Sequence, residues 1–347
     1  MRTTYSQKNG SGSAYFLRGI AICLTLASTH AAAQSIRVTE YAYKAVGGEF
    51  IEFTNVGPTS TNLAGWSIDD EESIPGSFDL SAAGVIAPGE SFVVTTVPAA
   101  AFRATWSLGA SPVKVLGDND TAKLSRTDSI VLFSPTFTEV DRLDFSDVNF
   151  EYTVRARDIS AWVCSSALGQ NDAYGWRQSA LGDAQGSTVS AAADVGSPGT
   201  HTSVICDPLV IGANYCAGRP NSTGFVGVMS ARGHPVVSQN VFSLQVIDLP
   251  PNVTGLAIMG QSQTLAPMAG GSQGTLCVGP GLTRLNSLVR SATPSGAWTA
   301  DLDISHPMAQ GLPAVLGGET WYFQLWYRDS NPSPTSNFST GWTVNFH

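Results

Sequence analysis

The sequence predicts an all-β protein built from two β-sandwich domains in series. Apolar residues come in short runs that often alternate with polar ones, rather than in helical stripes. The 35 glycines and 19 prolines interrupt these runs, as the turns between short strands require. The 347 residues, less the first 33, are too many for one typical domain and suit two.

The first 33 residues have the layout of a secretory signal peptide. A positive start (Arg2, Lys8 and Arg18) precedes a short apolar core at residues 20–27 and three alanines that end at Ala33. We predict cleavage after Ala33 and a location outside the cell or at the cell surface. A retained anchor is disfavoured because the apolar core is too short to span a bilayer. No later run approaches the roughly 18 apolar residues of a membrane-spanning helix, so the mature chain is predicted to lack a transmembrane segment.

Alternating runs predict the strands of the first domain. In residues 49–55, Ile51 and Phe53 point to one side while Phe50 and Glu52 point to the other, which is the pattern of a strand with one buried face. Turns that contain glycine or proline separate this strand from its neighbours. The other predicted strands are residues 36–40, 91–96, 129–133 and 139–144.

The second domain, residues 214–347, is predicted to follow a linker at residues 207–213. Its clearest strand is the aromatic run at residues 321–329, with further strands at 241–247 and 342–346. One face of the aromatic strand is predicted to be core: Trp321, Phe323, Leu325 and Tyr327. The other face carries Tyr322, Gln324, Trp326 and Arg328.

Three residues of that second face are candidate ligand-binding residues: Tyr322, Trp326 and Arg328. Aromatic rings with polar neighbours suit sugar rings, which have apolar faces and polar edges. The alternative, which we favour, is that the sandwich covers both faces of the strand.

Four cysteines remain once the signal peptide is removed: Cys164, Cys206, Cys216 and Cys277. An even number in an exported chain predicts two disulfides, for which three pairings exist. Sequence order favours Cys164–Cys206 and Cys216–Cys277, one bridge in each domain. A zinc site is disfavoured because the chain has no Cys-x-x-Cys pair and its histidines lack close ligand spacing.

Charge is distributed unevenly along the chain. Residues 34–207 contain 22 acidic and 10 basic side chains, a balance of −12, whereas residues 208–347 contain 5 of each. An acidic surface repels phosphate backbones, so we expect no nucleic-acid partner.

Two acidic clusters are candidate calcium sites in a chain that otherwise needs no cofactor. Their carboxylates are those of Asp69, Asp70, Glu71, Asp118 and Asp120, and Ca²⁺ prefers such oxygen ligands. An EF-hand starting at Asp118 is excluded, because Lys123 takes the place of the required glycine and Ser129 that of the bidentate glutamate. Solvated turns are the alternative for both clusters.

Catalytic patterns are weak. Residues 270–274 match G-x-S-x-G, but a nucleophile elbow needs a helix after it, and the apolar run at 276–278 predicts a strand, so a glycine-rich turn is favoured. Glu49 and Glu52 could form a hydrolase acid/base pair, but on a regular strand they lie on opposite faces. We therefore predict that the protein is not an enzyme.

The order of residues 36–40, 48–55, 62–68 and 86–94 resembles the lamin tail domain, an immunoglobulin-like β-sandwich. Gly117-Asp118, an apolar strand at 130–132 and Val140-Asp141 resemble its later part, and Ser197-Pro198-Gly199 its usual end. The resemblance implies an immunoglobulin-like fold for residues 34–206 and a role in interactions. Residues 98–113 look like an insertion.

Residues 214–347 resemble an uncharacterised β-rich module of exported proteins in planctomycete-like bacteria. The similar features are a Tyr-Cys start at Tyr215, a Leu-Cys-Val strand at 276–278, the aromatic strand and a Ser-Asn-Phe-Ser turn at 336–339. This resemblance implies no particular activity.

Together these observations predict an exported, non-catalytic binding or structural protein of the cell envelope or extracellular space, which engages protein or glycan partners. One alternative is a secreted hydrolase of glycans or phosphoesters, because bacterial lamin-tail-like domains often accompany such enzymes. The other is a calcium-stabilised adhesin. The oligomeric state does not follow from the sequence.

Overall fold

The computed structural model describes Met1, residues 35–305 and residues 314–347. Its contacts divide the chain into residues 1–34 and residues 35–347. Apart from Met1, the predicted signal peptide at residues 1–33 lies outside the described residues. Within the described ranges, no helix is both long and apolar enough to cross a membrane.

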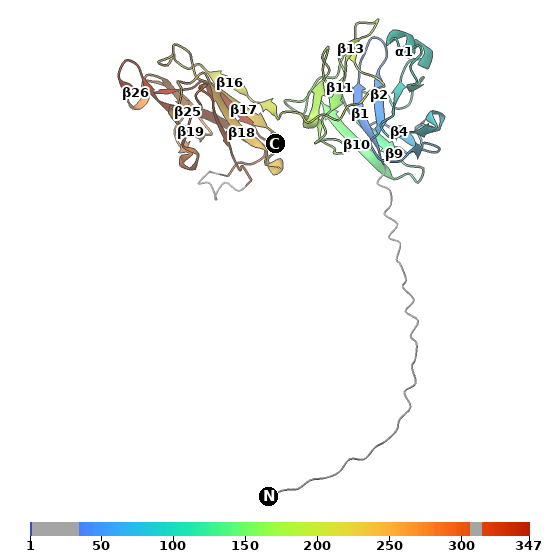
Figure 1. Ribbon diagram of the computed structural model, residues 1–347, viewed down its shortest axis with the longest axis horizontal. Helices are drawn as coiled ribbons and strands as arrows, with labels where there is room; N and C mark the ends of the chain where they lie inside the picture. The colour runs from blue at the N-terminus through green and yellow to red at the C-terminus, as the bar shows by residue number, and fades with distance from the viewer. Residues whose placement is uncertain (2–34, 306–313) are drawn as a thin grey trace. The chain divides into compact units, whose positions relative to one another are not determined.

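Two sheets form the first sandwich, which Figure 1 shows in blue to green. The larger sheet has the order β12 (Trp176–Gln178), β11 (Ala161–Val163), β1 (Ile36–Ala42), β2 (Phe50–Asn55), β7 (Ser91–Thr95) and β8 (Lys114–Leu116). The smaller has the order β10 (Glu139–Ser146), β9 (Thr127–Phe133), β4 (Ser67–Asp69) and β5 (Phe78–Asp79). Two short pairs complete it, β3 (Thr61–Asn62) with β6 (Val85–Ile86) and β13 (Thr188–Val189) with β14 (Val195–Gly196).

The core of the first sandwich includes Ile51 and Phe53 of β2, as the alternation predicts, together with Trp66. The rings of Phe53 and Phe92 stack with their centroids 5.3 Å apart. Each such buried aromatic ring removes a large apolar area from water, which is the main force that holds two sheets together.

The opposite face of β2 is buried as well, so the prediction of a single buried face is wrong. Residues 98–113, predicted as an insertion, include the helix α1 (Ala99–Thr105). Phe50 packs against Phe102 and Trp106 in a separate apolar cluster, with ring centroids 5.6 and 5.8 Å away. The helix therefore covers a sheet face that the strand pattern alone assigns to solvent.

Two further sheets form the second sandwich, from yellow to red in Figure 1. One has the order β15 (Leu209–Ile211), β17 (Val228–Gly233), β18 (Phe242–Ile247) and β24 (Trp298–Asp301). The other has the order β16 (Ala213–Cys216), β27 (Gly341–Asn345), β25 (Thr320–Ser330), β19 (Thr254–Gly260) and β22 (Thr283–Arg284). In addition β23 (Arg290–Ser291) pairs with β19, β26 (Pro334–Phe338) with β25, and β20 (Gln263–Pro267) with β21 (Thr275–Val278).

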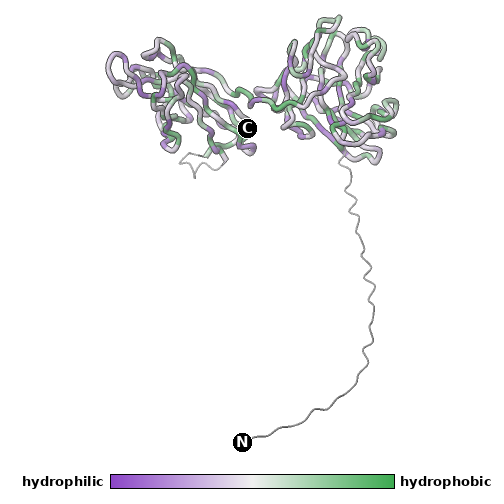
Figure 2. Tube along the Cα trace, in the orientation of Figure 1, coloured by the Kyte–Doolittle hydropathy of each residue, from purple (hydrophilic) through white to green (hydrophobic). Residues whose placement is uncertain are grey.

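Strands in these sheets make up most of the regular structure of the described residues, which confirms the predicted all-β fold class. No strand pairing within the described ranges joins the first sandwich to the second. Figure 2 shows hydrophobic and hydrophilic residues interspersed along both sandwiches. Residues 209–211 of the predicted linker form β15, which pairs with β17. The remaining helical turns are single 3₁₀ turns: η1 (Ser81–Ala83), η2 (Ala173–Gly175), η3 (Val237–Gln239), η4 (Ala269–Gly271) and η5 (Asn286–Leu288).

Candidate functional site

The aromatic strand β25 has the predicted core face. Trp321, Phe323, Leu325 and Tyr327 are all buried in the core of the second sandwich. Strict alternation then sends Tyr322, Gln324, Trp326 and Arg328 to the outer face of the sheet. The three candidate ligand-binding residues Tyr322, Trp326 and Arg328 therefore lie on the same face of β25, but their surroundings differ.

Gln324, at the middle of the outer face, is fully buried and holds β21 against the sheet. Its side-chain oxygen accepts the amide hydrogen of Cys277 at 2.9 Å, and its nitrogen donates to the carbonyls of Thr275 and Ser339 at 2.9 and 2.8 Å. All its hydrogen-bonding groups have partners, so its burial carries little penalty. The alternative of a covered outer face therefore holds at this position.

Tyr322 is partly covered and packs against Tyr215, with ring centroids 5.0 Å apart. Trp326 is half-buried and lines a hollow of about 390 Å³. We call this hollow the Trp326 groove. Its apolar lining consists of Leu256, Ile258, Leu276, Leu282, Trp326 and Phe338, and Ala269, Gly270 and Arg284 complete it.

Two arginines provide the positive charge at this place. Arg284 lines the groove itself, and the guanidinium carbon of Arg328 lies 5.0 Å from the centre of the Trp326 ring. A guanidinium over an indole face is attracted by the π electrons of the ring. Both arginines are exposed, and neither belongs to any ion pair found among the described residues.

The strands beneath the groove have little free backbone. β19 pairs with β25 along one edge and with β22 and β23 along the other. β25 pairs on its second edge with β26 and β27. The backbone of β19 and β25 is therefore largely used within the sheet, whereas β22, which carries Arg284, is the outermost strand.

The five candidate calcium ligands are not brought together. Within residues 35–305 and 314–347, no group of three or more His, Cys, Asp or Glu residues has a geometry that could hold a metal ion. Asp69 is buried and accepts the amide hydrogen of Ile74. Asp120 is exposed and pairs with Lys123 at 2.8 Å, while the backbone of Asp118 has a φ of 61°.

Glu71 and Asp70 belong to the exposed turn after β4. The amide of Glu71 donates to Asp128 at 3.2 Å, and a side-chain hydrogen bond to Asp128 raises the pKa of Glu71 to about 7. Burial is the main cause that raises the pKa of Asp70. Asp128 also accepts the amides of Ser125 and Ser129, so its oxygens are already used within the protein.

We expect excess calcium or EDTA to leave the melting temperature of the protein unchanged, because Asp69 and Asp128 already accept backbone amides. Differential scanning calorimetry measures this directly. An ion bound only by the folded state must raise its apparent stability. A calcium-dependent rise that EDTA reverses would contradict this expectation and favour the adhesin hypothesis.

Two glutamates that the sequence did not single out as a pair are buried side by side in the first sandwich. Glu40 of β1 and Glu52 of β2 are register partners, and their exposed fractions are 1% and 0%. Burial, the largest cause in both, raises the pKa of Glu40 to about 7 and that of Glu52 to about 8; the charge of Glu40 also raises the pKa of Glu52.

The glutamate pair holds the Ser-Pro-Gly segment in place. Glu40 accepts the amide and the hydroxyl of Ser197, both at 2.8 Å. Glu52 accepts the amide of Gly199 and the hydroxyl of Thr39, both at 2.6 Å. The pair thus has a structural role that spans 157 residues of sequence between Glu40 and Ser197.

Residues 270–274 form the predicted glycine-rich turn. Gly270 has a φ of 62°, and β21 follows directly. The hydroxyl of Ser272 is buried and donates to the carbonyl of Ser336 at 3.1 Å. Glu49, the other half of the considered acid/base pair, precedes β2 and accepts the amide of Leu124 at 2.7 Å.

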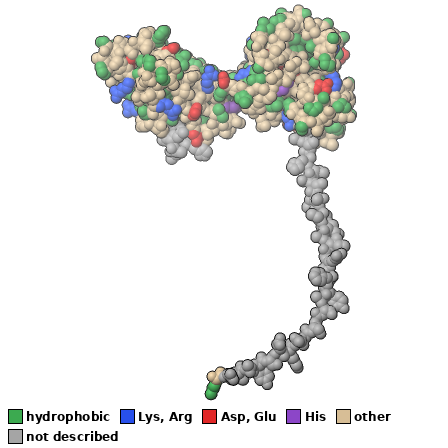
Figure 3. Space-filling view, in the orientation of Figure 1, with side chains coloured by type: hydrophobic (Ala, Val, Ile, Leu, Met, Phe, Trp, Pro, Cys, Tyr) green, Lys and Arg blue, Asp and Glu red, His purple; other side chains and the backbone are tan. Residues whose placement is uncertain are grey.

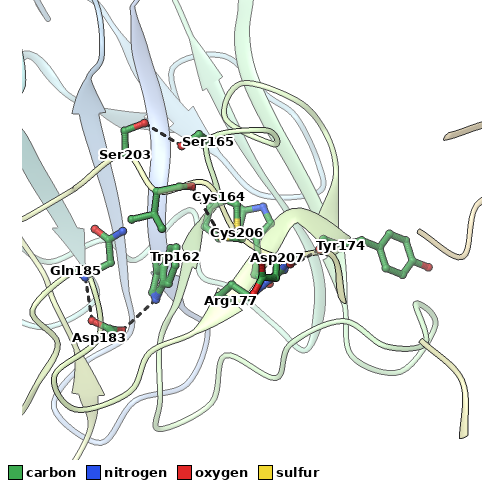
Figure 4. The surroundings of a disulfide bond; sticks show 12 residues. Trp162, Cys164, Ser165, Tyr174, Arg177, Asp183, Gln185, Ser203, Cys206 and Asp207 are labelled. Atoms are coloured by element: carbon green, nitrogen blue, oxygen red, sulfur yellow. Dashed lines mark hydrogen bonds between the residues drawn. A yellow bond between two sulfur atoms is a disulfide. The ribbon is translucent and has the colours of Figure 1, made fainter. Parts of the chain in front are cut away.

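The structure contains two disulfides, as the cysteine count predicts, and pairs Cys164 with Cys206 and Cys216 with Cys277. Figure 4 shows the first of them. Nearby, the indole of Trp162 donates to Asp183 at 3.1 Å and Arg177 donates to the carbonyl of Asp207 at 2.6 Å. Disulfides of this kind are typical of an oxidising, extracellular environment.

The first sandwich is of the immunoglobulin-like all-β class. Residues 29–147, which include β1 to β10, match the family model of the Lamin Tail Domain. This match supports the resemblance of the N-terminal part of the chain, whereas the comparisons do not support the resemblance of residues 214–347 to a bacterial module. The searches among curated proteins and among solved structures found no match.

Proposed function

We propose that this is an exported, non-catalytic binding protein of the cell envelope or extracellular space. Its Trp326 groove engages the partner, a glycan or a protein. The predicted signal peptide at residues 1–33 and the two disulfides support export. The lamin-tail-like sandwich serves as the structural or interacting partner module of the same chain.

The groove is the observation that carries this proposal. It combines a half-buried indole, further apolar side chains and a cation in a hollow of about 390 Å³. Small-molecule and side-chain binding sites are concave and mostly apolar, with a few polar groups that fix orientation. If β25 were covered on both faces, Trp326 would be buried, whereas it is half-buried and lines the groove.

The experiment uses immobilised protein to deplete fractions of envelope polysaccharide and envelope protein. We expect the wild type to retain a partner and the Trp326→Ala variant to lose it, because Trp326 has the largest side chain among the residues that line the groove. Phe137→Ala is the matched control, since Phe137 is an exposed aromatic residue of the first sandwich.

Equal retention by the wild type and Trp326→Ala would remove the groove from the proposal. Turnover of generic glycosidase, esterase or phosphatase substrates, lost on substitution of one polar residue, would replace binding by hydrolysis. The two outcomes are separable because the first measures retention and the second measures product.

A further inference from the structure

We propose that the ligand of the Trp326 groove is an acidic glycan, in which a pyranose ring packs in the groove and its carboxylate meets Arg284 and Arg328. This inference rests on the proposed function and adds the chemical class of the ligand.

The lining suits a sugar ring. Trp326 and Phe338 contribute aromatic surface, and Ile258 and Leu276 contribute aliphatic surface. Pyranose rings have faces of C–H groups that pack on apolar and aromatic side chains, while their hydroxyls remain at the edge. The volume of about 390 Å³ leaves room for a ring with its substituents.

The charge of the groove is of one sign. Its lining contains Arg284 and no acidic residue, and Arg328 lies over Trp326 at 5.0 Å. Both guanidinium groups are exposed and are without an ion pair among the described residues. A guanidinium binds a carboxylate through two parallel, charge-assisted hydrogen bonds, whereas the hydroxyls of a neutral sugar carry no charge to strengthen such bonds.

Residues 208–347 as a whole contain five acidic and five basic side chains, so the positive charge at the groove is a local excess. All basic residues after residue 207 are arginines, five in number, and Figure 3 shows basic side chains exposed on the surface of the second sandwich. Electrostatic complementarity therefore favours an anion at the groove over a neutral or cationic ligand.

An extended peptide fits less well. A peptide that adds to a sheet uses the unpaired backbone of an edge strand. Here β19 and β25 are paired on both edges where the groove lies. β22 lies at the edge of the sheet, but its two residues, Thr283–Arg284, offer little backbone for strand addition, so a ligand that contacts side chains is favoured.

The first test is titration calorimetry of the purified protein with acidic oligosaccharides. The probes are oligogalacturonate, oligomannuronate and oligoglucuronate, each compared with its uncharged methyl ester, and acetate alone. We expect at least one acidic oligomer to bind about tenfold more tightly than its ester, with an affinity that falls as salt is added. Acetate is expected not to bind measurably, because it lacks a ring.

Variants separate the charge from the ring. Arg284→Gln and Arg328→Gln are expected to weaken binding of the acidic oligomer about tenfold each and to leave binding of the ester unchanged. Trp326→Ala is expected to weaken binding of both. Arg232→Gln is the control, since Arg232 belongs to β17 of the opposite sheet.

Equal affinity for acid and ester would overturn the acidic class while leaving glycan binding intact. Binding of acetate as tight as that of the oligomers would reduce the site to an anion site. Failure of all three acidic series would overturn the inference, and a protein retained through Trp326 would then still support the proposed function. Failure of both experiments would remove the proposed function as well.

Discussion

Raising the pH from about 5 to about 8 is expected to lower the free energy of unfolding of the first sandwich, by on the order of 3 kcal/mol for a single buried glutamate whose pKa is raised to about 8. The reason is the buried pair Glu40 and Glu52, whose pKa values burial raises to about 7 and about 8. Glu49, with a pKa raised to about 8 mainly by burial, acts in the same direction.

The sign follows from proton binding. Between the ordinary glutamate pKa of 4.5 and the raised values, the folded state holds protons that the unfolded chain has released. The contribution of these protonated glutamates to the free energy of unfolding is therefore fully present below about pH 4.5 and is lost as the pH rises to about 8. Carboxylates such as Asp144 and Asp183, whose pKa values hydrogen bonds lower against the opposing effect of burial, oppose this at more acidic pH.

Glu52→Gln tests the cause. The new amide can keep an oxygen towards the amide of Gly199 and donate to the hydroxyl of Thr39, because the hydroxyl chain from Thr39 to Thr54 and Ser91 can reverse its direction. We expect the variant to be more stable than the wild type at about pH 8 and to have a flatter pH profile.

The measurement is urea unfolding followed by hydrogen exchange in peptides from β1 and β2, so that the first sandwich is observed by itself. Glu139→Gln is the control, because Glu139 is exposed. A wild-type stability that stays constant or rises between about pH 5 and about 8 would contradict the expectation.

The strands could be predicted from the sequence where local alternation determines them. Residues 321–329 identify both the core face of β25 and the candidate Trp326, because period-2 alternation needs no information from elsewhere in the chain. The outer face of β2 could not be predicted in the same way. Its burial depends on α1, which follows β7 and reaches Phe50 only through the fold.

The candidate site was predictable in part for the same reason. Trp326 and Arg328 share a strand face, but Arg284 comes from β22 and Phe338 from β26. Gln324 shares the strand face of Trp326 in the alternation, but its hydrogen bonds to β21 bury it. Contacts between distant strands thus decide which residues of an alternating face remain accessible.

The second large effect is expected from removal of the Cys216–Cys277 disulfide. This bond joins residues 61 apart in the sequence, and its loss frees the unfolded chain of a large loop constraint. We expect the double variant Cys216→Ser/Cys277→Ser to lose about 4 kcal/mol of unfolding free energy, as measured by urea unfolding without reductant.

The same variant is expected to weaken binding at the Trp326 groove, because Cys277 lies on β21 beside the groove residue Leu276. The matched control is Cys164→Ser/Cys206→Ser. Its disulfide joins residues 42 apart in the first sandwich, so the loss of stability is expected to be of similar size, about 4 kcal/mol, with groove binding retained.

If both double variants lose groove binding equally, the disulfide acts on global stability alone and β21 is not what shapes the groove. A loss of less than about 1 kcal/mol in the first double variant would show that the 61-residue constraint on the unfolded chain contributes little to the free energy of unfolding.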